Sequence, residues 1–501
     1  MKKFSRFLVT GLVITLISLS FLVIYDVKNF FDDPGFLWHL KDGRDILRTF
    51  SIPYEDNYLS LTRPWISDQW LSDVILYTLY SIGNFKLIFY FFTFLSITFI
   101  FFFYRKVILL KFSNSIVSTF VSILVILFCK IHFIARPVFF SFLLIICFLY
   151  LLEKFKNIND SKSFLVINLQ FFFLFFLYAN MHPSFFMAFF IWGVFVLESY
   201  IKNYKNFDYK KYIITSFVIL FATFINPYFI SLHESILFLS NSEYFMSLNE
   251  EWQSVKLFSV VGILATLIIS SISLSFFLSK DYRKKVSFTY FICSLVFYYY
   301  AMKHLRGVTY FSIISGIPLS ALLVKAYSFR ISNKICILRL LPKFLKHINL
   351  CLKNDKVCYA ACFIFAFTLV VSNFENKSDF KPCINKFPYK VASFINNNKL
   401  KGNIIASPDY GGFLSWHLHS VKPVMDDRNT LLGEKAYKDY INAQKSSRNM
   451  YYYAIKQDAP LVLVDKNTPK YKSYFKSDAF RVLFKSNKFM LLKVKIFDQY
   501  F

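Results

Sequence analysis

The sequence predicts an α-helical polytopic membrane protein that crosses the bilayer about eleven times and ends in a small α/β domain. The chain of 501 residues is 56% hydrophobic and has a mean hydropathy of +0.45, which is too apolar for a soluble protein. Apolar stretches long enough to span a bilayer recur up to about residue 373, and the remainder is polar enough to fold in water. We therefore divide the chain into a transmembrane domain, residues 1–373, and a soluble domain, residues 374–501.

The expected membrane spans are separated mostly by short polar connections. They lie at residues 7–25, 85–104, 115–131, 137–152, 163–179, 184–200, 212–226, 257–279, 286–301, 308–325 and 356–373. The first span follows Lys2, Lys3 and Arg6 and so has the charge order of a signal peptide. Bulky residues stand where a cleavage site would need small ones, so the sequence favours an uncleaved first helix.

The basic residues indicate how the chain is oriented. The formal net charge is +28 at pH 7, which in a soluble domain would suggest a nucleic-acid partner. Here Lys and Arg gather in connections near residues 105–111, 154–162, 202–211, 280–285 and 330–353, where they mark the cytoplasmic side. We therefore expect the lipid bilayer and no nucleic acid as a partner, with the N-terminus inside and the C-terminal domain outside.

Two long segments interrupt the series of spans, and both are expected outside. In the loop of residues 26–84, Phe36–Thr49 and Trp65–Tyr80 mix aromatic and charged residues at helical spacing, which is typical of helices lying in the membrane interface. The tail contains a predicted helix, a predicted turn at Gly411 and Gly412 that leads into a second helix, and four predicted strands. These elements are Pro388–Asn397, Asn403–Ala406, Asp409–His417, Lys422–Met425, Pro460–Val464 and Phe489–Val494.

The first outer loop opens with polar residues that could carry chemistry. Asp32 and Asp33 follow the first span closely, and a carboxylate there can take a proton from an incoming hydroxyl group or hold a cation. A helix N-cap at Asp33 before Pro34 explains the same pattern without chemistry, and the two roles are compatible. His39 and Arg44 are expected on nearby turns of one helix, where they offer a titratable group and a fixed positive charge.

Two arginines on the predicted outer side depart from the charge bias of the chain. Arg136 and Arg306 each lie between two spans. An arginine at a helix end often extends to the lipid headgroups, and that interpretation stays open. Guanidinium groups also bind phosphate through paired hydrogen bonds, so a phosphate-bearing ligand would explain both residues. His182 could join them, or it could cap a helix end before Pro183.

Two adjacent acids end the outer loop that follows residue 226. Glu250 and Glu251 precede Trp252, which could hold them near the membrane interface, where they would supplement Asp33. Adjacent acids are also common as simple solvated residues.

The tail carries its own group of charged residues. Asp426, Asp427 and Arg428 follow a predicted strand, and strand ends in α/β domains often bind ligands, so these residues could contact an acceptor. The sequence contains no Walker loop, dinucleotide fingerprint, His-Glu-x-x-His or Cys-x-x-Cys motif. The cofactor stays open, apart from a divalent cation that the acids could hold.

A series of short, different motifs lies along the predicted outer segments. They are Asp33-Pro-Gly-Phe-Leu-Trp-His-Leu40, Asp42-Gly-Arg44, Gln69-Trp-Leu71, Ala135-Arg-Pro137, Ala179-Asn-Met-His182, Asn226-Pro-Tyr228, Glu250-Glu-Trp252, His304-Leu-Arg306, Asp409-Tyr-Gly-Gly-Phe-Leu-Ser-Trp416 and Pro423-Val-Met-Asp-Asp-Arg428. Together they resemble a bacterial family of polytopic proteins related to the GT-C glycosyltransferases, whose first outer loop reads Asp-Pro-Asp-x-Trp-Trp-His-Leu. The resemblance covers nearly the whole chain.

The resemblance implies a GT-C-like fold in a bacterial cytoplasmic membrane, with a site outside that receives a sugar from a polyprenyl phosphate carrier. It implies that Asp33 acts as a base or holds a cation. The chain departs from the family pattern at Gly35, which replaces the second Asp, and at Leu37, which replaces a Trp. If the second Asp is the working base, Asp32 must substitute for it. The residues expected to bind lipid phosphate or substrate are His39, Arg44, Arg136, His182 and Arg306.

The function predicted from the sequence is transfer of a sugar from a polyprenyl-phosphate donor to an extracytoplasmic glycan, lipid or protein acceptor. Two alternatives stay open. A non-catalytic scaffold that binds glycans would account for the missing acid at Gly35. A carrier for lipid-linked substrates would place charged residues at the middle of its spans, where this sequence has almost none.

Overall fold

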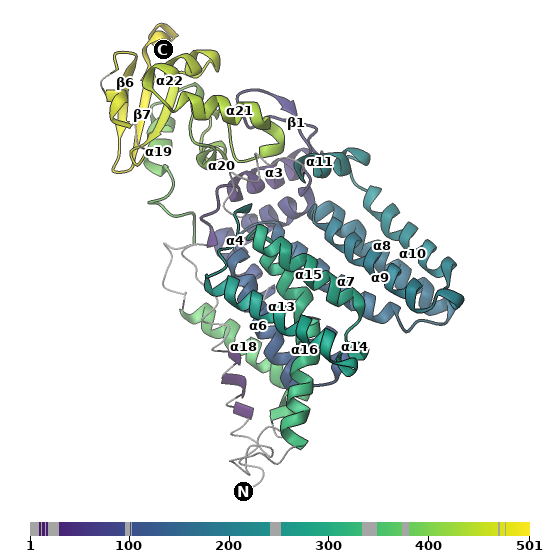
Figure 1. The fold of residues 1–501 in the computed structure, drawn as a ribbon. Helices are drawn as coiled ribbons and strands as arrows, with labels where there is room; N and C mark the ends of the chain where they lie inside the picture. Colours follow the sequence, from purple (N-terminus) through teal and green to yellow (C-terminus); the bar gives the residue numbers. More distant parts are fainter. Residues whose placement is uncertain are drawn as a thin grey trace.

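The computed structural model describes residues 10–11, 13–15, 17–18, 30–95, 101, 103–240, 252–332, 348–372, 380–468, 471–475 and 477–500. It consists of a helical body and, at one end of it, a small domain built around a β-sheet (Figure 1). The predicted first span, residues 7–25, falls largely outside the described residues, and so do Glu250 and Glu251.

Most of the predicted spans are helices of the body. The helices are α3 (Phe36–Thr49), α4 (Trp70–Leu95), α5 (Arg105–Phe112), α6 (Ser115–Cys129), α7 (Val138–Phe155), α8 (Ser161–Met181), α9 (Phe185–Lys202), α10 (Tyr209–Phe224), α11 (Ile230–Ser240), α13 (Val260–Leu278), α14 (Lys280–Lys285), α15 (Phe288–Lys303), α16 (Gly307–Ser332) and α18 (Asp355–Ser372). Within the described residues, seven segments are long and apolar enough to cross a membrane. Helices α10, α15 and α18 coincide with three further predicted spans. The chain is a multi-pass membrane protein.

Polar residues of the connections begin several of these helices. The side chains of Asn114, Asp160, Asp208 and Ser259 each accept a hydrogen bond from the backbone N–H group three residues later, in the first turns of α6, α8, α10 and α13. Such caps satisfy backbone donors that a helix leaves unpaired at its start. These four connections thus supply the residue that begins the next helix.

The first outer loop folds into helices that lie against each other. The predicted helix Phe36–Thr49 is confirmed as α3. The predicted interfacial helix Trp65–Tyr80 begins later, at Trp70, and continues through non-helical residues Gly83 and Asn84 into the next span as the bent helix α4. Helices α3 and α4 pack closely at Gly43, where a Cβ atom would lie 1.9 Å from the backbone oxygen of Asp73. Only glycine allows this approach.

The C-terminal domain is an α/β fold with a five-stranded sheet. Its elements are α19 (Tyr389–Asn397), β3 (Gly402–Ile405), α20 (Pro408–His417), β4 (Val421–Pro423), α21 (Asn429–Ala443), α22 (Ser447–Lys456), β5 (Leu461–Asp465), α23 (Tyr471–Phe475), β6 (Phe480–Lys485) and β7 (Phe489–Val494). The strand order is β4-β3-β5-β7-β6, parallel from β4 to β5 and antiparallel from β5 to β6. Every residue of β7 is buried, which places it in the core.

The predicted turn at Gly411 and Gly412 is wrong, because both residues lie inside α20. A Cβ atom on Gly411 would lie 2.2 Å from the backbone oxygen of Met425, and one on Gly412 would lie 2.8 Å from that of Pro34. The two glycines therefore let α20 approach both the end of β4 and the first outer loop.

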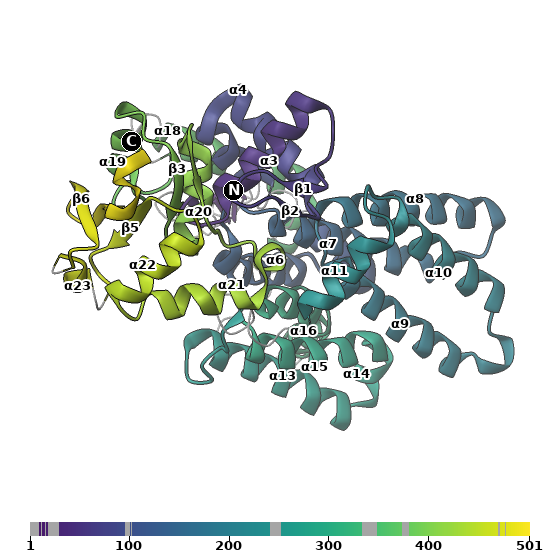
Figure 2. The ribbon, with the colours of Figure 1, turned by 90° about the horizontal axis from the view of Figure 1, so that it is seen from above.

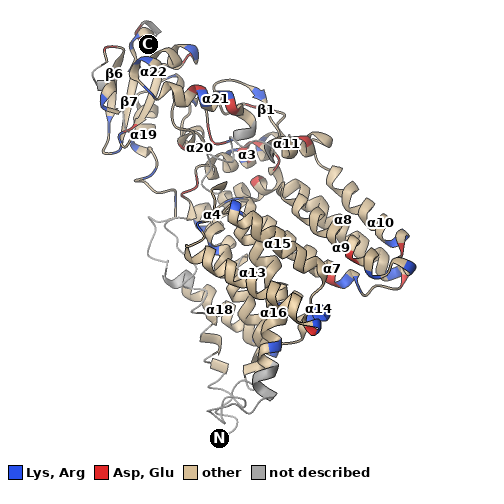
Figure 3. Cartoon of the chain, in the orientation of Figure 1, with Lys and Arg blue, Asp and Glu red and all other residues tan. Residues whose placement is uncertain are grey.

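The C-terminal domain rests on the first outer loop. The Ser60 amide donates a hydrogen bond to the Pro423 oxygen at 2.9 Å, and Arg63 Nη1 donates to the Leu432 oxygen at 3.0 Å. Figures 1 and 2 show the domain beside α3 and away from α8, α9 and α10. The connections predicted to be cytoplasmic, near α14 and between α9 and α10, lie at the end of the body farther from this domain (Figure 3). The two predicted sides of the protein are thus separated in space.

Candidate functional site

Two carboxylates and one guanidinium group meet where the two parts of the protein touch. Arg136, in the turn before α7, donates from Nε to Asp33 Oδ1 at 2.5 Å and from Nη2 to Asp427 Oδ2 at 3.3 Å. Asp33 belongs to the first outer loop and Asp427 to the C-terminal domain. Their side chains are 8% and 21% exposed, and that of Arg136 is 15% exposed. We call Asp33, Arg136 and Asp427 the acid cluster.

The local backbone fixes the position of Asp33. Helix α3 begins at Phe36, so Asp33 is not its N-cap, contrary to that interpretation of the sequence. Instead, Asp33 Oδ1 accepts a hydrogen bond from the Gly35 amide at 2.9 Å, an arrangement typical of aspartate in tight turns. The carboxylate therefore points toward Arg136.

Gly35 leaves room for the carboxylate from the C-terminal domain. A Cβ atom on Gly35 would lie 2.7 Å from Asp427 Oδ2 and 3.1 Å from Arg136 Nη2. Trp38 Nε1 donates to Asp427 Oδ1 at 3.0 Å and holds the carboxylate there. The acid that the family pattern carries at position 35 is missing from this loop, but a carboxylate from a distant part of the chain lies beside the same position.

The acid cluster is electrostatically unusual. Burial, opposed by Arg136 and reinforced by the nearby carboxylates of Asp426 and Asp33, raises the pKa of Asp427 to about 7. A carboxyl group with a pKa near neutrality can accept and return a proton at physiological pH. Sequence reasoning assigned this property to no residue of the tail.

The other predicted acid, Asp32, faces the chain that leads into the C-terminal domain. Its Oδ1 accepts a hydrogen bond from the Cys383 amide at 3.0 Å, and its backbone oxygen accepts one from Lys386 Nζ at 2.5 Å. These contacts tie the start of the C-terminal domain to the outer loop.

His39 and Arg44 lie on α3 as predicted, but they contact other groups. His39 is buried, its Nδ1 lies 2.7 Å from Asp73 Oδ1, and its ring stacks on that of Trp38 with 3.6 Å between centroids. Burial and the charge of Arg136 hold the pKa of His39 well below its ordinary value. Arg44 Nε donates to Asp45 at 2.8 Å, and its guanidinium group covers the ring of Trp416. Thus His39 supports Trp38, and Arg44 points toward Asp45 and Trp416.

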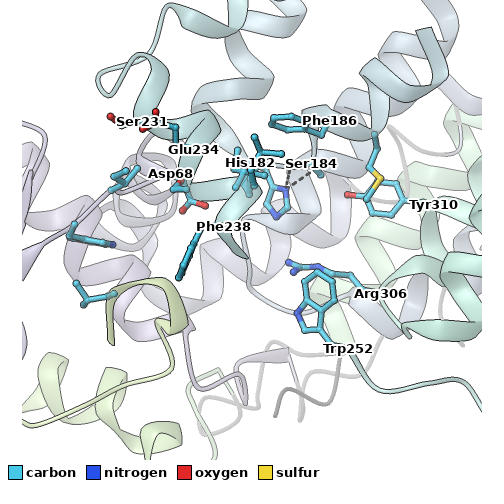
Figure 4. A pocket seen from close by; sticks show the side chains of 18 of the residues that line it. Asp68, His182, Ser184, Phe186, Ser231, Glu234, Phe238, Trp252, Arg306 and Tyr310 are labelled. Carbon is cyan, nitrogen blue, oxygen red and sulfur yellow. Dashed lines mark hydrogen bonds between the residues drawn. The ribbon is translucent and has the colours of Figure 1, made fainter. Parts of the chain in front are cut away.

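A mostly apolar cavity of about 630 Å³ contains two of the predicted phosphate-binding residues, His182 and Arg306 (Figure 4). It is formed by the first outer loop, the start of α9, α11 and the segment from α15 to α16. It is lined by Pro64, Trp65, Ile66, Asp68, His182, Pro183, Ser184, Phe186, Met187, Ser231, Glu234, Ser235, Ile236, Leu237, Phe238, Trp252, Tyr300, Arg306, Tyr310 and Leu431. We call it the outer cavity. Its size and its few polar groups are typical of a ligand site.

His182 is neutral and oriented. Its Nδ1 accepts a hydrogen bond from the Ser184 amide at 3.1 Å, which leaves Nε2 to carry the proton. Burial and the positive charges of Arg306 and Arg136 hold the pKa of His182 well below its ordinary value. The Arg306 guanidinium group lies over the Trp252 ring, 5.6 Å from its centroid. The cavity therefore offers one neutral N–H donor and one fixed cation.

The outer cavity and the acid cluster are neighbours. Trp65 lines the outer cavity, and its ring centroid lies 6.2 Å from that of Trp38, whose Nε1 donates to Asp427 of the acid cluster. Asp33 and Arg136 are not among the residues that line the cavity, whereas His182 and Arg306 are. The expected residues thus form two adjoining groups.

The outer cavity contains acids that were not singled out as candidates. Asp68, from the Pro64–Leu71 segment, has its pKa raised to about 6 by burial, and Glu234 comes from α11. The unusual density of aromatic and polar residues around Asp68 was visible in the sequence. Glu234 lies in the mostly apolar helix α11, without any such signal.

Asp426 and Arg428 hold the two domains together. Arg428 Nη2 lies 2.8 Å from Asp56 Oδ1 of the outer loop and 2.7 Å from Asp426 Oδ2. The guanidinium group also lies over the ring of Trp65, 4.6 Å from its centroid. Asp56 and Asp426 are fully buried, and Arg428 is 5% exposed. The contact of these residues with an acceptor stays a prediction, whereas their contact with the outer loop is a feature of the fold.

Two asparagine side chains bond to backbone groups at the ends of spans. The Asn180 side chain donates to the backbone oxygens of Phe176 and Ile225, and the Asn226 side chain donates to that of Thr223. Both amides therefore satisfy backbone groups at span ends. Among the residues that the structure describes, no group of three or more His, Cys, Asp or Glu side chains is arranged to hold a metal ion.

Comparison with solved structures identifies the fold. The archaeal oligosaccharyltransferase AglB from Archaeoglobus fulgidus, in complex with an inhibitory peptide and a dolichol-phosphate, matches with a TM-score of 0.59 and 11% identity over 93% of this chain and 70% of that one. An Archaeoglobus fulgidus oligosaccharyltransferase tethered to an acceptor peptide with the NVT sequon matches with a TM-score of 0.57 and 11% identity over 91% of this chain and 69% of that one. An Archaeoglobus fulgidus oligosaccharyltransferase in the apo form matches with a TM-score of 0.55 and 11% identity over 93% of this chain and 70% of that one. No family model and no curated protein sequence matches. The predicted GT-C-like fold with a C-terminal α/β domain is confirmed.

Proposed function

We propose that this protein is a membrane glycosyltransferase that moves a sugar from a polyprenyl-phosphate-linked donor to an acceptor outside a bacterial cytoplasmic membrane. The observation that carries the proposal is the outer cavity, with Arg306 and His182, directly beside the acid cluster. In this assignment the N-terminus is cytoplasmic and the C-terminal domain extracytoplasmic, which agrees with the distribution of basic residues.

The outer cavity suits the lipid phosphate of such a donor. Phe186, Met187 and Phe238 give it apolar walls for the first isoprene units. Arg306 can pair with the phosphate, and His182 can donate a hydrogen bond from Nε2. Because the neutral His182 adds a hydrogen-bond donor without a charge, the ionic contact of the phosphate in the cavity is the one with Arg306. The structure of AglB contains a dolichol-phosphate, a ligand of the same chemical class.

The acid cluster suits the acceptor. In the proposed step, the acceptor's nucleophilic atom forms a bond to the anomeric carbon, and the bond from that carbon to the phosphate oxygen breaks. The electron pair leaves with the lipid phosphate, whose negative charge Arg306 stabilises. The acceptor's proton goes to a carboxylate, and Asp427 is able to take it because its pKa lies near 7. Asp33 would orient the acceptor and balance Arg136.

The position of Asp427 bears on the scaffold alternative. That alternative rested on the missing acid at Gly35. The Asp427 carboxylate of the C-terminal domain lies beside Gly35 and binds the same arginine as Asp33, so two acids are present at this place although the loop itself supplies only Asp33. The sugar and the class of acceptor, whether glycan, lipid or protein, stay open.

The test is turnover by purified protein in proteoliposomes. Polyprenyl-phosphate-linked sugars carrying a radiolabel are supplied with membrane lipids and a mixture of peptide and glycan acceptors, and the release of free polyprenyl phosphate is measured. We expect release by the native protein and a loss of about a hundredfold in Asp33→Asn, because the acceptor is no longer held in the reactive orientation. Asp45→Asn is the matched control, since Asp45 lies in the same loop and contacts Arg44 instead of Arg136. Equal turnover in the two variants, or none in the native protein, would refute the proposal.

A further inference from the structure

A second cavity lies in the C-terminal domain, at the carboxyl ends of two neighbouring parallel strands. After β3 the chain passes through α20 to β4, on one side of β3. Strand β5 lies on the other side of β3, and the chain continues from it through α23 to β6, at the far edge of the sheet. The loops that follow β3 and β5 therefore leave in opposite directions. In open α/β sheets, ligands bind in the crevice that such a divergence creates.

The structure has a cavity of about 270 Å³ at this point, which we call the β3–β5 cleft. Ser407 follows β3, and Asp465 ends β5. The walls come from α20, α21 and α23, with Tyr410, Tyr440, Gln444 and Tyr474. At about 30 Å³ for each water molecule, this volume equals that of about nine waters, which is room for a single sugar ring.

The polar groups of the cleft favour a neutral ligand. Asp465 Oδ2 accepts a hydrogen bond from the Tyr410 hydroxyl at 2.8 Å and lies 3.6 Å from Lys488 Nζ, so its charge is compensated. Asp409 stands in the first turn of α20 and accepts a hydrogen bond from Ser407. A helix start would otherwise attract an anion, but the Asp409 carboxylate already occupies this position. Lys445 also lines the cleft, so the two carboxylates of Asp409 and Asp465 are balanced by Lys445 and Lys488, and the absence of a net positive charge disfavours a phosphate or carboxylate ligand.

The remaining chemistry matches a carbohydrate. Three tyrosine rings offer apolar faces for the C–H groups of a sugar, and their hydroxyl groups offer hydrogen bonds. The Gln444 amide, which lies 2.6 Å from the Tyr440 hydroxyl, provides both donors and an acceptor. A carboxylate, an amide and hydroxyl groups beside aromatic rings form a set that can satisfy the hydroxyls of a pyranose while burying its less polar face.

We propose that the β3–β5 cleft binds one neutral hexopyranose ring, at a site separate from the acid cluster. Helix α20 connects the two sites. Tyr410 lies in the cleft, while its neighbour Gly411 packs on Asp426 and Gly412 packs on Pro34. A sugar held in the cleft therefore contacts the helix that touches the outer loop at the acid cluster. The cleft would hold a sugar of an acceptor or of a product.

The experiment uses the full-length protein in lipid nanodiscs, which avoids detergents that carry sugars. The probes are the methyl glycosides of glucose, galactose, mannose and N-acetylglucosamine, and binding is followed by saturation-transfer difference NMR. We expect at least one glycoside to bind the native protein. Gln444→Leu should weaken that binding about five- to tenfold, since one hydrogen-bonding group is lost. Gln457→Leu, at the end of α22 and outside the cleft, should leave it unchanged.

Tyr410→Phe removes one hydroxyl group with little change of shape, so it tests sugar binding in the cleft if Gln444→Leu fails to fold. It too should weaken binding relative to Gln457→Leu. The proposal is overturned if no glycoside binds, if only phosphorylated sugars bind, or if binding is the same in all three variants. Because no lipid donor is present, the result does not depend on whether the protein transfers sugars.

Discussion

Replacing Arg428 by leucine should loosen the C-terminal domain from the first outer loop. The guanidinium group of Arg428 lies within 2.8 Å of carboxylate oxygens of both Asp56 and Asp426, and both acids are fully buried. The variant has a shorter, apolar side chain and leaves two buried carboxylates without their cation. The perturbation therefore acts at the contact between the two domains.

The size of the effect follows from the burial of the pair. Removing one partner of a buried ion pair costs about 3–5 kcal/mol. Asp56 keeps its hydrogen bonds from the backbone amides of Tyr58 and Leu59, at 3.2 and 3.1 Å, which favours the lower end of that range. A loss of about 3 kcal/mol changes the equilibrium between docked and undocked states by a factor on the order of 100.

Hydrogen exchange measured by mass spectrometry reports this equilibrium. We expect the amide of Ser60 to exchange up to about a hundredfold faster in Arg428→Leu, since its hydrogen bond to the Pro423 oxygen forms only in the docked arrangement. Arg448→Leu, on the exposed side of α22, is the matched control. Unchanged exchange in Arg428→Leu, or equal acceleration in Arg448→Leu, would refute the assignment of Arg428 to domain docking.

Three further predictions concern the acid cluster and the outer cavity. Gly35→Ala should lower turnover and reduce the free energy of unfolding by about 1–3 kcal/mol, because its Cβ would lie 2.7 Å from Asp427 Oδ2. Gly193→Ala is the control and should change neither quantity, because no atom lies within 4 Å of its Cβ. Folding raises the pKa of Asp427 from 3.8 to about 7, so the stability that this group contributes is present at low pH and is lost as the pH rises to about 7. The free energy of unfolding should therefore fall over this pH range in the native protein, and this part of the fall should be absent in Asp427→Asn. Arg306→Gln should weaken binding of labelled polyprenyl phosphate about tenfold or more, while Arg283→Gln, on α14, should leave it unchanged. Equal behaviour of a variant and its control, or the same pH slope with and without Asp427, would contradict the corresponding prediction.

Local patterns of the sequence were sufficient for much of the fold. The mixture of aromatic and charged residues in Phe36–Thr49 repeats with the helical period, and α3 has those bounds. Strands β5 and β7 are central and buried, so each appears as a continuous apolar run. Strand β6 was missed because it lies at the edge of the sheet and mixes exposed and half-buried residues, with Arg481 and Lys485 among them.

The partners of the site residues could not be predicted in the same way. Asp33, Arg136, His182 and Arg306 could be selected because they lie on one predicted side of the membrane. The contact of Arg136 with Asp427 joins residues 291 positions apart, and it exists only because the C-terminal domain docks on the outer loop. Nothing in the local sequence around Gly35 indicates that a carboxylate from elsewhere fills the space beside it.

The most direct test of the account is a structure of the protein with a polyprenyl-phosphonate analogue of the sugar donor, determined by electron cryo-microscopy in nanodiscs. We expect the phosphonate to contact Arg306 and His182 in the outer cavity, with the sugar directed toward Asp33 and Asp427. A phosphonate bound elsewhere, or a sugar directed away from the acid cluster, would contradict the claim that the two sites act on one bound molecule.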